Sequence, residues 1–399
     1  KEVGEVVNHY RRKDSRIIYK KLECNRGISD NTNAGIEIAT GDYIGLLDHD
    51  DILHPSALYE CMIAITEKKA DFIYTDENTF EGNLDNVVCY HFKPDYAPDT
   101  LRSNNYICHF SVFDKKLLKI VSGFRAEYDG SQDYDLILRL TEIAKIIVHI
   151  PKALYLWRSH PNSVASEIGA KPYAIAAAKK ALTDHLKRQG LDGQVLDAKI
   201  PSTYRIRYKL IGNPLVSILI PNKDHIEDLD KCLKSIMEKS TYNNYEIIII
   251  ENNSEEEETF DYYENIQGEN IKVVRWSGNF NYSAINNFGF QFAKGEQIIL
   301  LNNDVEIISN NWIEEMLMFS QRTDVGAVGA KLYYPDDTIQ HAGVILGLLT
   351  LAGHIHRYLP RNNPGYMGRL FFAQNLTCVT AACMMLSRNI YEEVMGLDE

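Results

Sequence analysis

The chain repeats itself, and this repeat limits how it can fold more than any other feature does. When the sequence is aligned with itself at an offset of 254 residues, ten identities fall within one 26-residue window. The identical pairs are Asn25 and Asn279, Ser29 and Ser283, Asn33 and Asn287, Gly35 and Gly289, Ala39 and Ala293, Gly41 and Gly295, Ile44 and Ile298, Leu46 and Leu300, Leu47 and Leu301, and Asp50 and Asp304. A second, weaker match at an offset of 273 residues aligns Asp114, Leu118 and Gly123 with Ser387, Tyr391 and Gly396. Agreement of this kind predicts two copies of one domain.

The boundary between the two copies can be placed from the pattern of residues 172–190, which is helical and ends at a glycine. We predict a first domain over 1–165, a helical linker over 166–213 and a second domain over 214–399. The second copy has about 64 residues between the start of its first predicted strand and Asn279, whereas the first copy has only 24 residues before Asn25. The first domain is therefore expected to lack its first two strands, and the second to lack its C-terminal catalytic part.

Short apolar segments alternate with helical segments in the second copy. The predicted strands are 216–220, 245–250, 271–274 and 297–301, and the predicted helices are 229–237 and 282–293. Continuously apolar strands such as 247–250 indicate a largely parallel sheet that is covered on both faces. We therefore predict an α/β fold with a Rossmann-like, mostly parallel sheet, on which ligands bind beyond the carboxyl ends of the strands.

The overall charge excludes one class of partner. The net charge of −13 argues against nucleic-acid binding, which needs a clustered basic surface. An acidic protein that handles an anionic substrate would instead need a bound cation or a local basic pocket. The seven cysteines are scattered, which predicts reduced thiols in the cytoplasm. The longest apolar run, 342–353, is too short to span a bilayer.

Four polar residues, Asp48-His49-Asp50-Asp51, follow the apolar segment 43–47. Carboxylates at the carboxyl end of a buried strand are suitable ligands for Mg²⁺ or Mn²⁺, which bind one or two carboxylates together with substrate phosphate. The alternative is a solvated turn in which Asp51 or Ser56 caps the next helix. The coincidence of Asp50 with Asp304 in the second copy favours the metal.

Several segments resemble family 2 glycosyltransferases of the GT-A fold. Residues 41–51 resemble the strand and Asp-x-Asp motif of that family, and residues 123–140 resemble its Glu-Asp segment, with Gln132 where glutamate is usual. In the second copy, 216–222 resembles the first strand of the family and 251–254 the end of its second strand. The tandem arrangement resembles bacterial enzymes that build surface polysaccharides. The resemblance therefore implies two GT-A domains.

The resemblance assigns a catalytic role to Asp133. An inverting transferase needs a base that takes the proton from the acceptor hydroxyl, and Asp133 matches that base. Its expected place at the start of a helix favours the ionised carboxylate. The alternative is a helix cap.

The resemblance also implies ligands for the metal and the donor in the first copy. Asp50 would bind the metal, and Asp48 would assist it or bind the ribose, with His49 beside them at the donor. His160 would reach the metal or the diphosphate, with a structural histidine as the alternative. Arg158 is a second candidate for the diphosphate.

Further donor contacts follow from the repeat and from the resemblance. Ser29 and Asn33 lie four residues apart on one helical face, so they are candidates for the floor of the nucleotide site, with packing between helix and sheet as the alternative.

The second copy has its own candidates. Pro221, Asn222 and Asn252 match positions that line the nucleobase. Asn302 and Asp304 stand where the first copy has Asp48 and Asp50, which leaves one carboxylate for metal. The second site is therefore either changed in specificity or degenerate.

Two clusters of charged or titratable residues in the second copy can be explained without a metal site. His341, His354 and His356 could bind metal, but a loop that faces the acceptor is preferred because no cysteine or carboxylate lies at ligand spacing. Residues 255–258 are four glutamates, which are expected in a solvated first helical turn.

The predicted function is a metal-dependent, inverting transfer of a sugar from a UDP- or dTDP-linked donor to a glycan or lipid-linked acceptor. Mg²⁺ or Mn²⁺ would be the cofactor. We expect a cytoplasmic protein without a transmembrane segment, and peripheral attachment to the inner membrane stays open. The alternatives are a second copy that only binds glycan or a partner, and a sugar-phosphate nucleotidyltransferase. The second alternative is disfavoured because 221–225 contains no glycine.

Overall fold

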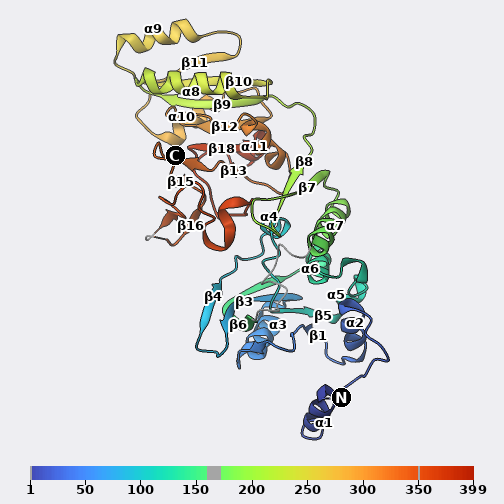
Figure 1. Cartoon of the computed structure of the whole chain (residues 1–399). Coiled ribbons are helices and arrows are strands. Elements are labelled where there is room, and N and C mark those ends of the chain that lie inside the picture. Colours follow the sequence, from blue (N-terminus) through green and yellow to red (C-terminus); the bar gives the residue numbers. More distant parts are fainter. Residues whose placement is uncertain (1, 160–171, 349–350) are drawn as a thin grey trace. The chain divides into compact units, whose positions relative to one another are not determined.

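The computed structural model describes residues 2–159, 172–348 and 351–399 and shows an α/β chain in two compact units (Figure 1). Unit 1 comprises Lys1–Arg207 and Tyr366–Asn375, and unit 2 comprises Tyr208–Gly365 and Leu376–Glu399. Among the described residues, no helix is both long enough and apolar enough to cross a bilayer.

The unit boundary differs from the predicted one. The helix predicted at the start of the linker is α7 (Pro172–Arg188), and its Ala181 and Leu182 are fully buried in the core of unit 1. Tyr204, in β8 (Tyr204–Tyr208), belongs to the same core. Most of the described part of the predicted linker is therefore an integral part of unit 1, because its apolar side chains complete that core.

Unit 2 contains the parallel sheet that the sequence predicts, in the strand order β11-β10-β9-β12-β18-β13. The first four of these strands are parallel, and β18 and β13 run antiparallel to their neighbours. All six predicted elements are present, and their ends agree with the prediction to within one helical turn. They are β9 (Val216–Asn222), α8 (Ile226–Lys239), β10 (Tyr245–Asn252), β11 (Ile271–Trp276), α10 (Tyr282–Phe290) and β12 (Gln297–Leu301).

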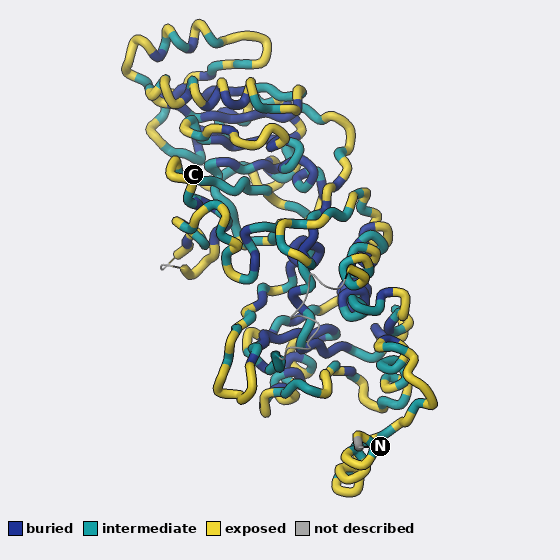
Figure 2. Tube along the Cα trace, viewed as in Figure 1, coloured by how far each residue is buried: buried dark blue, intermediate teal, exposed yellow. Residues whose placement is uncertain are grey.

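Both faces of this sheet are covered, which explains why its strands are continuously apolar. Ile247 and Ile249 face the core shared with α8 and α11 (Trp312–Ser320), whereas Ile248 and Ile250 face the core shared with α10. The burial of successive residues on both faces is visible in Figure 2, where the central strands of unit 2 are dark blue. This is the arrangement that a parallel sheet requires.

Unit 1 does not have the mostly parallel sheet that was predicted for both copies. Its strand order is β1-β5-β3-β6-β2, with β4 paired to the outer part of β3. Only β3 and β6 are parallel, and the other pairs are antiparallel. The prediction came from apolar runs in the second copy, and unit 1 shows no counterpart of the parallel strands β9 and β10 among its described residues. The strands are β1 (Tyr43–Gly45), β2 (Ile52–Leu53), β3 (Phe72–Glu81), β4 (Val87–His91), β5 (Ser111–Asp114) and β6 (Ile147–Ser159).

The second repeat is visible as one strand-to-helix connection that occurs in both units. In unit 1, β1 pairs antiparallel with β5, which leads into α5 (Lys115–Ile120). In unit 2, β12 pairs antiparallel with β18 (Cys383–Ser387), which leads into α12 (Arg388–Glu393). The side chains of Asp114 and Ser387 each accept a hydrogen bond from the first turn of the helix that follows.

The remaining elements complete the two units. In unit 1 they are α1 (Glu2–Arg11), α2 (Ile28–Ile38), α3 (Ala57–Lys68), α4 (Pro98–Ser103), η1 (Ala126–Tyr128), α6 (Gln132–Ile143) and β7 (Gly193–Asp197). In unit 2 they are α9 (Glu257–Ile266), β13 (Val328–Gly329), β14 (Leu332–Tyr333), β15 (Ile339–His341), β16 (Val344–Leu346) and β17 (Ala352–His354). The helix η3 (Tyr366–Phe371) lies in the segment that returns to unit 1.

This returning segment (Tyr366–Asn375) is fixed to unit 1 by side-chain to backbone hydrogen bonds. The Tyr366 hydroxyl donates to the backbone oxygen of Tyr90 at 2.6 Å and accepts from the backbone N–H of Phe92 at 2.7 Å. Asn375 Oδ1 accepts from the backbone N–H groups of Asp99 and Thr100, at 2.7 and 3.3 Å. Because α4 has no side-chain cap of its own, Asn375 provides it.

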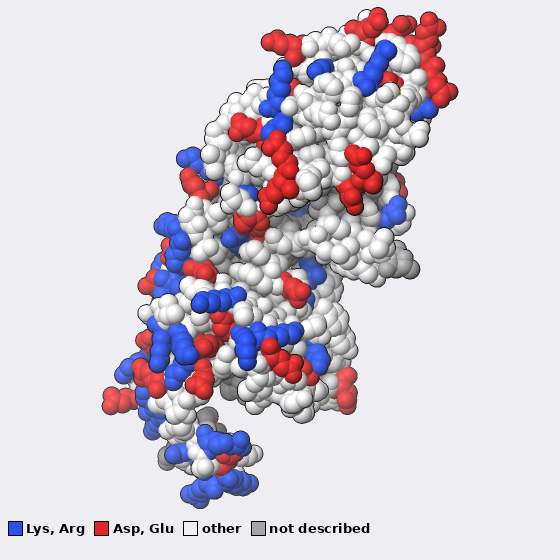
Figure 3. Space-filling view, turned by 180° about the vertical axis from the view of Figure 1, so that it is seen from behind, with Lys and Arg blue, Asp and Glu red and all other residues white. Residues whose placement is uncertain are grey.

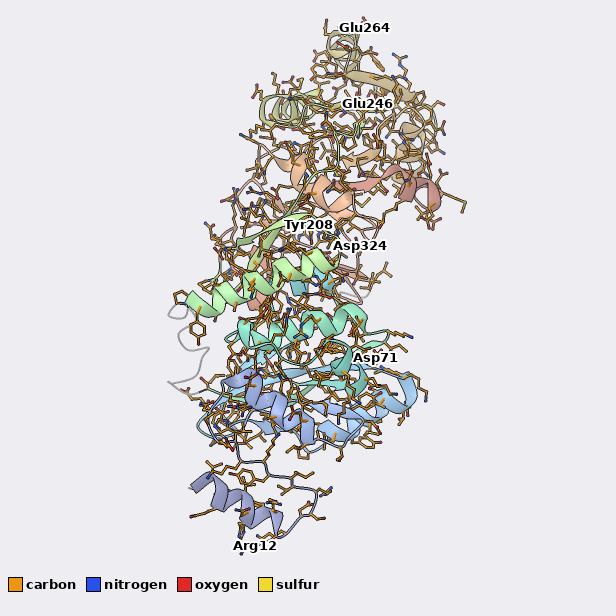
Figure 4. The ribbon with its side chains drawn as sticks, turned by 90° about the vertical axis from the view of Figure 1, so that its right-hand side faces the viewer. Arg12, Asp71, Tyr208, Glu246, Glu264 and Asp324 are labelled. Atoms are coloured by element: carbon orange, nitrogen blue, oxygen red, sulfur yellow. The ribbon has the colours of Figure 1, made fainter. Side chains whose placement is uncertain are left out.

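The amino-terminal ends of the unit 2 strands are closed by polar contacts. Glu246, labelled in Figure 4, lies near the start of β10 and accepts hydrogen bonds from the Ser217 hydroxyl and the Lys294 backbone N–H, both at 2.6 Å. The carboxyl ends of the same strands carry Asn222 and Asn252. Polar residues therefore occur at both ends of these strands, and those at the carboxyl ends take no part in the contacts of Glu246.

The four glutamates at 255–258 are exposed and lead into α9, as the sequence predicts. Figure 3 shows acidic side chains gathered over the end of unit 2 that carries this helix. They have the surface position expected of a solvated helix start.

Candidate active site

The acidic loop after β1 is held in place by β6. Asp51 Oδ2 accepts from the Tyr155 hydroxyl at 2.5 Å, and Asp51 Oδ1 accepts from the Arg158 backbone N–H at 2.8 Å. Arg158 Nε donates to the backbone oxygen of Asp50 at 2.8 Å. Burial raises the pKa of Asp51, although the hydrogen bonds from Arg158 and Tyr155 oppose that rise. Asp51 therefore anchors the loop, which corrects its predicted alternative role as a helix cap.

Asp48, in the same loop, lies next to a histidine that the sequence analysis missed. Its Oδ2 atom is 3.7 Å from His109 Nε2, and His109 Nδ1 is 3.6 Å from Oε2 of Glu77. The ring of His109 stacks on Tyr155, with 4.9 Å between the ring centroids. The hydrogen bond from His109 lowers the pKa of Asp48, so the pair favours the ionised carboxylate.

Glu77 is the buried centre of this cluster. It lies on β3 and also contacts His91 Nδ1 at 2.9 Å and Lys93 Nζ at 3.4 Å. Burial alone would raise the pKa of Glu77, but the charge of Lys93 and the hydrogen bonds of His109 and His91 lower it well below its usual range. Lys93 also donates to the backbone oxygens of Ile107 and His109. A buried, ionised glutamate therefore fixes the position of His109.

The predicted base, Asp133, lies in the first turn of α6, as expected. Its Oδ2 atom accepts hydrogen bonds from Cys108 Sγ at 3.0 Å and from Asn105 Nδ2 at 3.2 Å. Burial raises the pKa of Cys108 to about 12, so this cysteine is a thiol and can donate its proton. Gln132, which stands in place of the usual glutamate, accepts from the Gly130 backbone N–H at 2.8 Å.

These contacts join the acidic loop and the base into one cluster. The contacts run from Asp48 to His109 at 3.7 Å, from His109 Nε2 to Cys108 Sγ at 3.6 Å, and from Cys108 to Asp133 at 3.0 Å. Two motifs that are far apart in the sequence therefore meet in unit 1. Carboxylates from a loop at a strand end and from a helix start are thereby placed around one site.

The other residues predicted for this site are placed differently. The Arg158 guanidinium lies 4.6 Å from the ring of Phe80 and supports the loop, so its predicted contact with a diphosphate is not needed to explain its position. His49 is exposed, and its Nδ1 atom lies 3.8 Å from Asp50 Oδ1. His160 lies outside the described residues.

Ser29 and Asn33 have partners within the fold, and this favours the packing role that the sequence left open. Ser29 is fully buried and donates to Asp129. The Asn33 amide donates to the backbone oxygen of Phe124 and accepts from its backbone N–H, both at 2.9 Å. In unit 2, Asn287 makes the same two contacts with Leu397, at 2.9 and 2.8 Å. A contact that occurs in both units explains why this asparagine is repeated.

The predicted nucleobase residues of unit 2 lie beside an open groove of about 400 Å³. The groove is lined by Lys223, Asn252, Asn253, Ser277, Gly278, Asn279 and Phe280. Asn222 is buried next to it, and its Nδ2 atom donates to the Tyr263 hydroxyl at 2.7 Å. Pro221 precedes Asn222 in β9 and is partly exposed.

The loop after β12 joins the same region of unit 2. Asn303 Nδ2 donates to Asn222 Oδ1 at 2.6 Å, so this loop touches the residues beside the groove. Asn302 donates through its backbone N–H to Ala382 at 3.0 Å, and the Asp304 side chain is exposed. The loop after β12 and the carboxyl end of β9 are therefore close in space.

A divalent cation would fit the acidic loop of unit 1. Among residues 2–159, 172–348 and 351–399, no three histidine, cysteine or carboxylate groups form a complete metal site. Asp48 and Asp50 offer hard oxygen ligands, and Mg²⁺ or Mn²⁺ commonly binds one or two carboxylates and completes its coordination with water and phosphate oxygens. The donor set is therefore suitable for a cation that is bound together with a phosphorylated ligand.

In the second copy, His341 and His354 contact each other, and within the described part of the chain neither belongs to a group of three possible metal ligands. Their Nδ1 atoms are 3.0 Å apart. Burial, together with the charge of His354, lowers the pKa of His341 to about 4. His341 is therefore neutral near pH 7. The seven cysteines are free thiols, as predicted.

An acidic loop at a strand end and a carboxylate at a helix start are joined by contacts in unit 1, and such a loop suits a cation that is bound together with a phosphorylated ligand. The comparison with known families identifies the class of protein. The sequence model of glycosyl transferase family 2 matches residues 1–120 and 217–395, so the chain belongs to this family. This agrees with the resemblance found in the sequence.

Two curated relatives align over the whole chain. The protein y4gI of Sinorhizobium fredii is 44% identical over 405 residues, which are 100% of this chain and 44% of that protein. The O-antigen biosynthesis protein RfbC of Myxococcus xanthus is 35% identical over 401 residues, which are 100% of this chain and 31% of that protein. The chain therefore spans less than half the length of either relative.

The likeness to solved structures is weak. The Staphylococcus aureus TarS 1-349 structure with UDP-GlcNAc has a TM-score of 0.36 and 16% identity, and the match covers 47% of this chain and 60% of that chain.

Proposed function

We propose that unit 1 transfers a sugar, with inversion, from a nucleotide-sugar donor to a hydroxyl of a glycan or lipid-linked acceptor, and that both units are GT-A domains. The observation that carries this proposal is the cluster that joins Asp48 to Asp133 through His109 and Cys108. It supports the proposal because it connects the carboxylate proposed to bind the donor with the carboxylate proposed as the base.

Asp133 is the proposed base. It accepts the proton of the acceptor hydroxyl while the hydroxyl oxygen forms a bond to the anomeric carbon of the donor sugar. On the opposite side of that carbon, the bond to the diphosphate oxygen breaks, and the nucleoside diphosphate leaves with the bonding electrons. The first turn of α6 supports this role, because the helix dipole favours an ionised carboxylate there.

Asp48 and Asp50 are the proposed residues that hold the donor diphosphate through Mg²⁺ or Mn²⁺. The bound cation would supply positive charge to the leaving diphosphate. His109 supports this assignment because it orients the Asp48 carboxylate from the buried side. The predicted contacts of His49, Arg158 and His160 with the donor belong to the same proposal.

For unit 2 we propose a nucleotide-binding groove lined by Asn252, with Asn222 and Pro221 behind it and Asp304 as a single metal ligand. An amide such as Asn252 can both donate to and accept from a nucleobase edge. A unit 2 that binds a nucleotide or glycan without catalysis is the second candidate, and Asn302 favours it because this amide stands where the first copy has the carboxylate of Asp48.

The proposed process is the synthesis of a cell-surface polysaccharide, with a UDP- or dTDP-linked donor. It is supported by the 35% identity to the O-antigen biosynthesis protein RfbC over the whole chain. A cytoplasmic site of action is part of the same proposal, because nucleotide sugars are cytoplasmic donors.

The test is a screen of UDP- and dTDP-sugars with and without Mn²⁺, read out by thermal shift and by release of nucleoside diphosphate. A donor that binds only the folded protein raises its Tm. Asp133→Asn should keep the Mn²⁺-dependent shift but release nucleoside diphosphate roughly 10²–10⁴-fold more slowly. Asp50→Asn should lose the Mn²⁺-dependent shift of the unit 1 transition.

Asp304→Asn is the matched control in unit 2. It should leave turnover unchanged if unit 1 carries the catalysis. Full turnover in both Asp133→Asn and Asp50→Asn would refute the proposal for unit 1.

A further inference from the structure

The two hydrogen-bond donors that contact Asp133 use the same oxygen. Cys108 Sγ and Asn105 Nδ2 both contact Oδ2, at 3.0 and 3.2 Å. Among the described residues, no hydrogen bond reaches Oδ1 of Asp133. One oxygen of the carboxylate is therefore fixed by the protein, and the other is left for a ligand.

We propose that Asn105 and Cys108 are positioning residues, which hold Oδ2 of Asp133, stabilise the ionised carboxylate and leave Oδ1 as the oxygen that accepts the proton. This inference rests on the proposed role of Asp133 as the base. It assigns a role to two residues in the segment between α4 and β5 that carry no recognisable motif.

Asn105 makes this contact at a cost, and the cost argues for a functional role. Its Oδ1 atom is buried and has no hydrogen-bond partner among the described residues. A buried carbonyl oxygen without a partner is unfavourable. The reverse orientation of the amide would bring its oxygen towards the Asp133 carboxylate, where two acceptors would repel. The amide is therefore oriented for Asp133.

Cys108 can act as a donor only while it is protonated. The thiol lies next to Asp133 on one side and 3.6 Å from His109 Nε2 on the other. The pKa of Cys108 is raised to about 12, first by burial, so the thiol keeps its proton at neutral pH. Its S–H group can then donate to the carboxylate, and a hydrogen bond to the charged form of an acid favours that form.

The expected effect of each donor can be derived from ordinary carboxyl behaviour. A hydrogen bond to the charged form of an acid favours that form. Removal of one donor should therefore make Asp133 harder to ionise. The titratable groups on the Cys108 side of Asp133 are Cys108 and His109. His109 is unchanged in every variant, and Cys108 changes only where it is itself replaced.

The experiment is a titration of Asp133 in the full chain by ¹³C NMR with ¹³Cγ-labelled aspartate, with Asp133→Asn used to assign the signal. Asn105→Ala and Cys108→Ala should each shift the titration of the Asp133 signal to higher pH. Cys108→Ser keeps a hydroxyl donor and should restore a pKa close to that of the wild type. Asn104→Ala is the matched control for its neighbour Asn105 and should not shift the signal.

A purely structural role predicts a different set of results. In that case Asn105→Ala and Cys108→Ala would lower Tm but leave the pKa of Asp133 unchanged, and this result would overturn the inference. The positioning role predicts that Asn105→Ala changes Tm little, because this variant also removes the buried oxygen that has no partner.

The same variants separate this inference from the proposed function. If transfer is detected, the acidic limb of kcat/KM should move upward together with the pKa of Asp133. Full transfer by Asp133→Asn would refute the base, whereas unchanged pKa values in Asn105→Ala and Cys108→Ala would refute the positioning role whatever the activity.

Discussion

The two aspartates on the first turn of α6, Asp133 and Asp135, should affect stability and turnover in opposite ways when each is replaced by asparagine. Asp133 faces the proposed site, whereas Asp135 is fully buried and accepts four hydrogen bonds from the guanidinium groups of Arg125 and Arg139. Arg139 is also buried and donates to the backbone oxygens of Val121 and Gly123, at 2.6 and 2.9 Å. We predict that Asp135→Asn destabilises unit 1 and that Asp133→Asn does not.

The magnitude follows from the burial of this network. Removing one partner of a buried ion pair costs about 3–5 kcal/mol, because the other charge stays buried without compensation. A domain is stable by only about 5–15 kcal/mol, so Asp135→Asn should remove a large part of the free energy of unfolding of unit 1. For a unit of this size the expected fall in Tm is roughly 6–20 °C.

The assay combines calorimetry with the release of nucleoside diphosphate. Asp135→Asn should lower one unfolding transition, that of unit 1, and keep turnover at temperatures where unit 1 is folded. Asp133→Asn should unfold like the wild type and lose turnover by roughly 10²–10⁴-fold. An Asp135→Asn variant that is stable but inactive, or an Asp133→Asn variant that is unstable, would refute this assignment of a structural and a catalytic aspartate.

Three further predictions concern contacts outside the site. Asn33→Ala and Asn287→Ala each remove two backbone hydrogen bonds, so both should cost about 1–3 kcal/mol in urea unfolding, in unit 1 and unit 2 respectively, and a loss in only one unit would contradict their equivalence. The low pKa of His341 means that the unfolded chain binds a proton more readily than folded unit 2 does. The stability of unit 2 should therefore fall by up to about 3 kcal/mol as pH falls from 6.5 to about 4, and His341→Gln should weaken this dependence of stability on pH. Asn375→Ala removes the cap of α4 and should cost about 1–2 kcal/mol in the calorimetric transition of unit 1, with no change expected in that of unit 2.

The sequence predicts the sheet of unit 2 well because burial on both faces leaves a clear signal. Residues 247–250 are four isoleucines, and successive side chains of a covered parallel strand must all be apolar. Unit 1 gives no such signal. Its central strand β3 contains Asp76 and Glu77, which are buried by polar partners from other segments, so the polarity of the strand hides its position.

The candidate site was predicted in part for a similar reason. Asp48, Asp50 and Asp133 belong to motifs that can be found in sequence, and the structure joins Asp48 and Asp133 in one cluster. His109 and Glu77 were missed because their importance depends on contacts between β3, the segment before β5 and the acidic loop, and neither residue has a counterpart in the repeat. Glu77 gave no signal in the sequence, because its neighbours Asp76 and Asn78 are polar as well.

The returning segment has a consequence for biosynthesis. Unit 1 includes Tyr366–Asn375, although the rest of it ends at Arg207. At about 5–20 residues per second, a ribosome needs roughly 10–30 s to synthesise the intervening residues. During this time the start of α4 has no Asn375 to cap it, so unit 1 can reach its final form only after almost all of unit 2 has been translated.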